Sequence, residues 1–316
     1  MRTALIATVL NEADGIGEFL ASLEDQTRVP DVIVVTDGGS TDGTWDFLSQ
    51  FAGSTALPFR FLRVPGNRSR GRNAAIRESG ADLIAVTDVS VLDPAWFERI
   101  LAPLETGQAD VVAGWYELLV DTPRDRAVGL LTQYSLEEVN PERFLPSSRS
   151  VAFTRDAWER VGGYPEHLIT TEDTAFDLAL RKAGCRFVFE PDAVVKWRPA
   201  ASAGGAYRMY RQFSESDGEA GIFLWSYTRY GLLYGAYGAG ILILLSAFFI
   251  PTLSILLGVG IPIYLAFRIR KLFREGLFSE MLYGLLVVLA LDVARLTGYL
   301  KGRWAGRKGP SISDLT

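Results

Sequence analysis

Short apolar runs alternate with helical patterns through about the first 120 residues of the chain. The runs are rich in β-branched residues and end at polar turns, as buried strands do. They predict strands at residues 4–9, 32–36, 59–64, 83–87 and 111–116. Apolar residues at helical spacing predict helices at 16–23, 44–51, 72–79 and 95–104. Strands alternating with helices indicate an α/β fold with a mostly parallel sheet and right-handed crossovers.

Polar side chains follow three of these strands. Asn11 and Glu12 come after the first strand, Asp37 after the second and Asp88 after the fourth. The carboxyl ends of parallel strands meet at one edge of a sheet, and such sheets bind ligands there. The glycine-rich turn at 36–44 would let a bulky nucleotide approach the backbone, although alone it also fits a solvated turn that caps the next helix.

A second acidic feature lies later in the chain, where Glu172 and Asp173 follow Thr170 and Thr171. A threonine can cap the helix predicted after this point, and carboxylates in a first helical turn are favoured by the helix dipole. The acidic pair alone therefore indicates a helix start as readily as a catalytic role.

The last third of the chain is apolar, with segments at 232–250, 252–267 and 281–300. About 20 apolar residues cross a bilayer, so the first two predict a membrane hairpin through Pro251. The basic residues at 268–271 favour the cytoplasmic side. The third segment fits either another span or an interfacial helix, because basic residues also follow it. A buried helical bundle is the alternative that needs no membrane.

Composition narrows the possible functions. The chain has 316 residues, of which 48% are hydrophobic, enough for roughly two domains with full cores. Its net charge of −5 argues against a general nucleic-acid partner, which requires a basic surface. The single cysteine excludes an internal disulfide and fits a reducing compartment.

Taken in order, several segments resemble the family-2 glycosyltransferases, which have a GT-A fold. The resemblance runs from about residue 3 to 221 and rests on the segments 8–12, 37–44, 67–76, 87–88, 162–166 and 171–173. Residues 208–221 are also similar to membrane-attached exopolysaccharide transferases related to succinoglycan synthesis. The resemblance implies inverting transfer of a sugar from a nucleoside diphosphate donor to a hydroxyl acceptor.

The resemblance also implies roles for individual residues. Asp173 would be the general base that takes the proton of the attacking hydroxyl, and Glu172 would position the acceptor or the base. Asp37 would hold the base and ribose of the donor, and Arg72 would reach the base or the diphosphate from a helix start. The residues assigned to the donor nucleotide are Asn11, Glu12, Asp37, Arg72, Asp88 and Lys196.

A divalent cation, Mg²⁺ or Mn²⁺, is implied as cofactor, with Asp88 as its one named ligand. Ser90 stands where this family usually carries a second acid, and Lys196 where it often carries a histidine. A hydroxyl and an ammonium suit a hard cation poorly. We therefore expect weak, donor-assisted metal binding, with Lys196 helping to neutralise the leaving diphosphate. The only histidine, His167, is expected to order the acidic loop.

These patterns predict a GT-A catalytic domain at 1–225, transmembrane or interfacial helices at 226–303 and a cytoplasmic tail at 304–316. We expect a multi-pass protein of the inner or plasma membrane, with its catalytic domain in the cytoplasm. It would transfer sugar to a saccharide or lipid-linked acceptor in cell-surface polysaccharide or glycolipid synthesis, and it is compatible with a homo-oligomer.

Two alternatives remain open, and two others are disfavoured. A polyprenyl-phosphate acceptor would make the product a lipid-linked sugar donor. Ser90 and Lys196 also motivate a catalytically degenerate glycan-binding or scaffold subunit. A nucleotidyltransferase is disfavoured because an acidic rather than a basic glycine-rich turn follows the first strand, and a dinucleotide-binding dehydrogenase because no Gly-x-Gly-x-x-Gly does.

Overall fold

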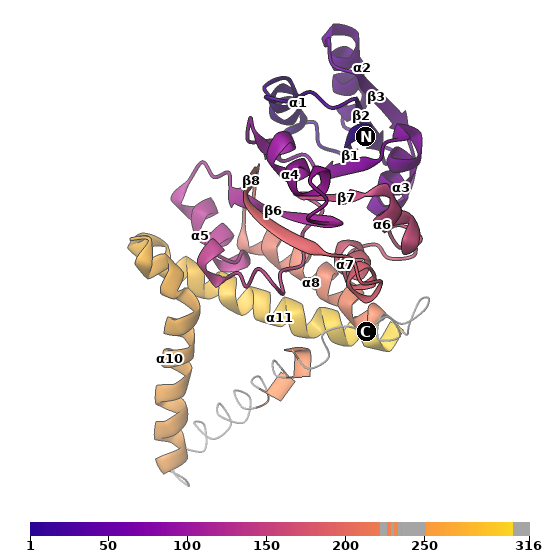
Figure 1. Cartoon of the computed structure of the whole chain (residues 1–316). Helices are drawn as coiled ribbons and strands as arrows, with labels where there is room; N and C mark the ends of the chain where they lie inside the picture. The colour runs from indigo at the N-terminus through magenta and orange to yellow at the C-terminus, as the bar shows by residue number, and fades with distance from the viewer. Residues whose placement is uncertain (222–225, 229–230, 233–234, 236–250, 306–316) are drawn as a thin grey trace. The chain divides into compact units, whose positions relative to one another are not determined.

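The computed structural model describes residues 1–221, 226–228, 231–232, 235 and 251–305 of the chain (Figure 1). The chain divides into two compact units. The first unit comprises Met1–Leu119 and Leu136–Trp197, and the second comprises Val120–Ser135 and the described part of Arg198–Ser313.

The first unit is built on an eight-stranded sheet with the order β3-β2-β1-β4-β7-β6-β8-β5. Its strands are β1 (Thr3–Val9), β2 (Val32–Asp37), β3 (Phe59–Arg63), β4 (Leu83–Thr87), β5 (Val91–Leu92), β6 (Val111–Leu118), β7 (Val151–Thr154) and β8 (Phe187–Trp197). β1 to β4 pair in parallel, whereas β7 is antiparallel to both of its neighbours. The predicted α/β fold is confirmed, and its five predicted strands are β1 to β4 and β6.

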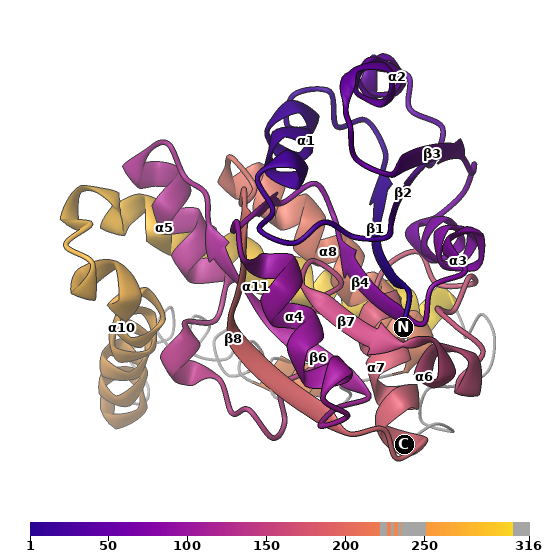
Figure 2. The same cartoon turned by 45° about the horizontal axis from the view of Figure 1, so that its top comes forward.

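Helices cover both faces of this sheet (Figure 2). They are α1 (Ile16–Glu24), α2 (Thr44–Ser54), α3 (Arg68–Ser79), α4 (Trp96–Glu105), α6 (Arg155–Arg160) and α7 (Glu172–Lys182). The helix predicted at 72–79 begins earlier, at Arg68, because the side chain of Asn67 accepts a hydrogen bond from the backbone N–H of Arg70 at 3.0 Å. Apolar spacing could not reveal this first turn, which is rich in arginine.

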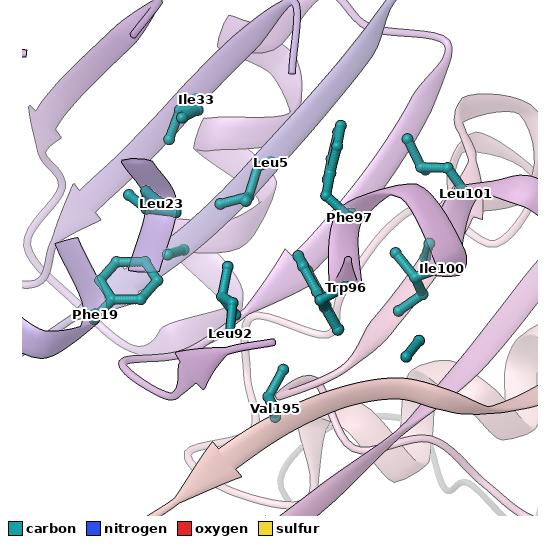
Figure 3. Packing of buried hydrophobic residues seen from close by; sticks show 14 of the residues in the cluster. Leu5, Phe19, Leu23, Ile33, Leu92, Trp96, Phe97, Ile100, Leu101 and Val195 are labelled. Carbon is teal, nitrogen blue, oxygen red and sulfur yellow. The ribbon is translucent and has the colours of Figure 1, made fainter. Parts of the chain in front are cut away.

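The core lies in two layers, one on each face of the sheet. On one face, α1 and α4 pack against the sheet, with α4 over β4, β6, β7 and β8, and Figure 3 shows Phe19 and Leu23 near Leu5, with Trp96 and Phe97 from α4 alongside. On the other face, α3 packs against β1 and β2 and α6 against β7, while Phe176 of α7 belongs to the same apolar cluster as Ile76 of α3. Strands β1, β2 and β4 are thus buried on both sides, and their carboxyl ends are held rigidly.

The second unit consists of helices. They are α5 (Pro123–Thr132), α8 (Ala203–Ala220), α10 (Pro251–Arg274) and α11 (Met281–Ala305). The second compact unit therefore includes α8, whereas the predicted catalytic domain at 1–225 also contains this helix. Packing does not say where the catalytic function ends, so the predicted domain bounds stay a prediction.

Only one candidate membrane-spanning helix is found in the part of the chain that the structure describes. It is Phe278–Ala305, with a mean hydropathy of 1.7, and it contains the third apolar segment of the sequence. The predicted span at 232–250 lies almost entirely outside the described residues. The predicted span at 252–267 lies within α10, which begins at Pro251 as the sequence break suggested.

Glycines allow α8 and α11 to approach backbone to backbone. A Cβ atom added to Gly302 would lie well within 3.0 Å of the carbonyl oxygen of Glu215, and one on Gly298 equally close to that of Arg211. From the opposite helix, Gly218 faces the carbonyl of Tyr299 in the same way. The buried contact therefore has no room for a side chain at these positions.

We expect Gly302→Ala to destabilise the protein by about 1–3 kcal/mol, because the added methyl group must force two backbones apart. The measurement is thermal unfolding of the purified full chain. Gly204→Ala in α8 is the matched control, since its new Cβ would meet only ordinary contacts at 3.7 Å and beyond. Equal melting temperatures for Gly302→Ala and wild type would contradict the close packing.

Candidate functional site

The turns after β1 and β2 are joined by hydrogen bonds. The backbone N–H of Asn11 donates to Oγ of Ser40 at 2.8 Å, and Oδ1 of Asn11 accepts from the N–H of Thr41 at 2.9 Å. Asn11 reaches this position with a left-handed backbone, at a φ of 55°. The N–H of Glu12 donates to Oγ1 of Thr44 at 2.8 Å. The predicted convergence of these two turns is present in the structure.

Asp37 is the last residue of β2, and its side chain is completely buried. Its Oδ1 accepts hydrogen bonds from Gly39 and from both the backbone and the hydroxyl of Ser40. Burial alone would raise the pKa of Asp37, but these hydrogen bonds and Arg63 outweigh it and lower the pKa. The ionised carboxylate keeps a second oxygen, Oδ2, that lies 3.3 Å from Arg63 and accepts no hydrogen bond from the described residues.

The third turn, after β4, carries Asp88. Parallel pairing places Thr87 level with Ala7 of β1, so Asp88 follows at the same edge as Asp37. Burial raises the pKa of Glu12, and the charge of Asp88 raises it further, which places these two carboxyl groups near each other. Lys196 is exposed on β8 and pairs in register with Val91, just past Ser90.

Both oxygens of Asp88 are already engaged. Oδ2 lies 3.1 Å from Nε of Arg149, and Oδ1 accepts a hydrogen bond from the hydroxyl of Ser90. No group of three or more His, Cys, Asp or Glu side chains that could hold a metal is found among the described residues. One carboxylate that faces a guanidinium does not fit a divalent cation, which prefers several negatively charged or neutral oxygens.

Arg72 lies in the second turn of α3, rather than at the predicted helix start, and forms a buried ion pair with Glu172. Its terminal nitrogen is 2.7 Å from Oε1 of Glu172, and each side chain is only 4% exposed. The guanidinium also lies over the ring of Tyr164, at 5.2 Å. Burial would lower the pKa of Arg72, but Glu172 outweighs this and raises it, so Arg72 stays charged.

The start of α7 differs from the prediction. Thr171 holds the N-cap position but has a left-handed backbone, at a φ of 67°, and its side chain makes no capping hydrogen bond. The left-handed conformation costs a residue with a side chain about 1–2 kcal/mol. Such strain persists where the surrounding structure demands it, often at functional sites.

Asp173 follows in the first turn of α7 and remains partly exposed. Its Oδ1 accepts a hydrogen bond from the N–H of Thr174 at 2.8 Å. Burial and the charge of Glu172 raise the pKa of Asp173 despite the nearby Arg72. This carboxylate therefore holds a proton more readily than an ordinary aspartate.

Sequence reasoning missed two charged residues at this edge of the sheet and on α7. Arg149 occurs in the irregular segment before β7, and Asp177 lies on the apolar face of α7, one turn after Asp173. The signal for Asp177 was its spacing of four residues from Asp173, which places both on one helical face. Nothing in the sequence around Arg149 indicated its contact with Asp88, which is 61 positions away.

Residues 4–146 match the profile described as glycosyl transferase family 2. The glycosyltransferase AglE of Haloferax volcanii is 26% identical over 237 residues, which cover 72% of this chain and 76% of AglE. This chain is a glycosyltransferase. The matched profile ends before Glu172, Asp173 and Lys196, so it contains only part of the predicted site.

Solved structures show the fold. The mannosyltransferase PcManGT from Pyrobaculum calidifontis, in complex with GDP-Man and Mn²⁺, aligns with a TM-score of 0.60 and 18% identity, over 96% of this glycosyltransferase and 87% of PcManGT. TarS 1–349 of S. aureus in complex with UDP aligns with a TM-score of 0.49 and 18% identity, over 68% of this chain. The chain spans 64% of that TarS fragment. The GT-A fold is confirmed; the exopolysaccharide branch stays a prediction.

The buried carboxyl of Asp177 generates a prediction about stability. Burial and the charge of Asp173 raise its pKa well above the usual range, so the folded protein keeps a proton that the unfolded chain releases above about pH 4. Because the unfolded state then binds fewer protons, stability falls as pH rises from the unfolded pKa towards the folded one. We expect Asp177→Asn to raise the melting temperature relative to wild type, by a margin that grows from about pH 4 to pH 7.

Asp46→Asn is the control, since Asp46 is exposed in the first turn of α2. A melting-temperature difference for Asp177→Asn that stays constant over this pH range would contradict a neutral buried carboxyl.

Proposed function

We propose that this glycosyltransferase moves a sugar from a nucleoside diphosphate-sugar to a hydroxyl acceptor, with inversion at the anomeric carbon. The observation that carries the proposal is Asp173, a partly exposed carboxylate with a raised pKa at the strained start of α7. PcManGT, which shares the fold, is in complex with the nucleotide sugar GDP-Man, and this supports the same class of donor.

The donor half of the site would be the edge formed by the ends of β1, β2 and β4. The hydrogen-bonded turns at Asn11 and Ser40 make this edge rigid, and Asp37 ends there with an ionised carboxylate. Its Oδ2 is an unused acceptor for an N–H of the base or a hydroxyl of the ribose. A charged acceptor that lacks a hydrogen bond gains one when the nucleotide binds.

The acceptor half would be the start of α7. A sugar hydroxyl is a weak nucleophile, so inversion requires a base that removes its proton during the attack. The hydroxyl oxygen bonds to the anomeric carbon, the bond to the diphosphate oxygen breaks, and the proton moves to Asp173. Glu172 is held by Arg72 and would keep the first turn of α7 in place rather than take the proton itself.

We expect Asp173→Asn to lower the transfer rate by on the order of 10²–10⁴ while leaving donor affinity within a few-fold, because the amide cannot accept the proton. The assay measures nucleoside diphosphate release from UDP-, GDP- and dTDP-sugars with saccharide and lipid-phosphate acceptors. In the wild type, the rate should fall as pH drops through the raised pKa of Asp173, since only the ionised form is a base.

Asp156→Asn is the matched control, because Asp156 also lies in a first helical turn of the same unit but is exposed. Near-normal turnover by Asp173→Asn would remove this residue from the mechanism. Wild-type release of no nucleoside diphosphate with any donor would contradict the function itself.

We propose that the enzyme lies at a membrane surface, because α11 has an exposed apolar face. One face of α11 is buried, and the other exposes a row of apolar side chains: Leu282, Leu286, Leu289, Val293 and Leu300. The buried face contacts α8 from Tyr283, whose hydroxyl accepts from Ala203, to Lys301, which pairs with Glu215 at 2.6 Å.

That contact favours an interfacial helix over a third span. α8 carries charged residues along its length, and a spanning α11 would bring them into hydrocarbon, where each is costly. An amphipathic pair on the surface leaves the charges in water and the apolar row in lipid. Arg270, Lys271 and Arg274 at the end of α10 favour the cytoplasmic face. A saccharide or lipid-linked acceptor, polyprenyl phosphate included, suits this location; the multi-pass topology remains our expectation.

We expect cysteines that replace Leu282, Leu289 and Leu300 one at a time to lie at the same shallow depth in a bilayer. The measurement is quenching of an attached fluorophore by nitroxide lipids labelled near the headgroup or at the bilayer centre, in a chain whose Cys185 has been replaced. A cysteine at exposed Asp156 is the control that should not be quenched. Strong quenching at position 289 by the central nitroxide would show a span instead.

A further inference from the structure

Arg149 occupies the outer side of the carboxylate that would otherwise be the metal ligand. Its Nε lies 3.1 Å from Oδ2 of Asp88, and its side chain is 23% exposed. The guanidinium stacks over the ring of Trp197 at 4.3 Å and lies 5.8 Å from that of Tyr116. Asp88, Trp197 and Tyr116 thus hold the positively charged guanidinium of Arg149 beside the turn that follows β4.

The guanidinium has capacity for a further ligand. Its Nε is buried and makes no hydrogen bond of good geometry. Within the described residues, its terminal nitrogens donate one long hydrogen bond, of 3.4 Å, to Oγ of Ser147. An arginine presents a planar fork that matches phosphate oxygens bidentately. A buried donor without a partner is costly, and a bound anion removes that cost.

The charges around Asp88 also oppose a metal. Arg149 pairs with Asp88, and Lys196, the residue before Trp197, is exposed at the neighbouring strand end. Three other acids lie nearby: Glu12, whose pKa is raised, Glu117, which is level with Lys196 across β6 and β8, and Asp173, whose carboxylate is partly stabilised by the charge of Arg149. A divalent cation at Asp88 would have to displace Arg149 or share one carboxylate with it.

We propose that Arg149, in place of a divalent cation, binds and neutralises the diphosphate of the donor, and that Asp88 is the positioning residue that aims it. This inference rests on the proposed function, because it requires a nucleoside diphosphate donor. As the bond to the sugar breaks, negative charge builds on the diphosphate, and a fixed guanidinium stabilises that charge without having to reorganise. Lys196 adds a second positive charge at the same edge.

The test compares the binding of UDP, GDP and dTDP with that of their monophosphates, by calorimetry on the full chain in detergent. We expect wild-type affinity for the preferred diphosphate to be the same, within about twofold, in chelator and in Mg²⁺. In chelator, Arg149→Gln should weaken diphosphate binding by about 10–100-fold, the effect typical of a lost charged hydrogen bond, and monophosphate binding much less. Arg28→Gln is the matched control, because Arg28 is similarly exposed and pairs with Glu105.

Two further variants separate contact from charge screening. If Arg149 only screens Asp88, the double variant Asp88→Asn with Arg149→Gln recovers diphosphate affinity, and the proposal is overturned. If Arg149 touches the diphosphate, the double variant stays weak. Arg149→Met keeps the stem over Trp197 and repeats the measurement should the glutamine variant fail to fold.

The remaining outcomes distinguish failure of this inference from failure of the proposed function. Unchanged diphosphate affinity in Arg149→Gln, or wild-type binding that requires metal, overturns the role of Arg149 and leaves the proposed function intact. Failure of the wild type to bind any of the three diphosphates, with or without metal, overturns the proposed function and this inference with it.

Discussion

Arg72 and Glu172 are both buried and lie 2.7 Å apart, so each compensates the charge of the other. A buried charge without a partner destabilises the folded state by several kcal/mol. The pair joins α3, which packs against β1 and β2, to α7, which carries Asp173. The pair therefore helps to fix the start of α7 relative to the edge of the sheet where β1, β2 and β4 end, and burial together with the charge of Glu172 raises the pKa of Asp173.

Local pattern explains what could be predicted. β1, β2 and β4 are nearly continuous apolar runs because both of their faces are buried, and the helices between the strands show regular apolar spacing. The short β7 and the polar first turn of α3 carry too little of that pattern. Asn11, Asp37 and Asp88 could be placed together because parallel strands end at one edge, and this requires only strand order.

Contacts between distant segments explain what was missed. Arg149 lies in an irregular segment and meets Asp88 only because β7 inserts antiparallel beside β4. The donor-binding role of Arg72 stays a prediction, but its buried pair with Glu172, a hundred positions away, could not be predicted from the sequence. In both cases the sequence contains several acids that could pair with the arginine, and only the folded arrangement of the strands and helices determines which one does.

The glycine contact between α8 and α11 has a consequence for motion. Main-chain atoms of the two helices touch at Gly218, Gly298 and Gly302, so neither helix can roll or slide along the other without a backbone clash. Side-chain contacts relax by changing rotamers, but at these three glycines there is no side chain that can move. The two helices therefore move as one body, and a force applied to the exposed apolar row of α11 is transmitted to α8.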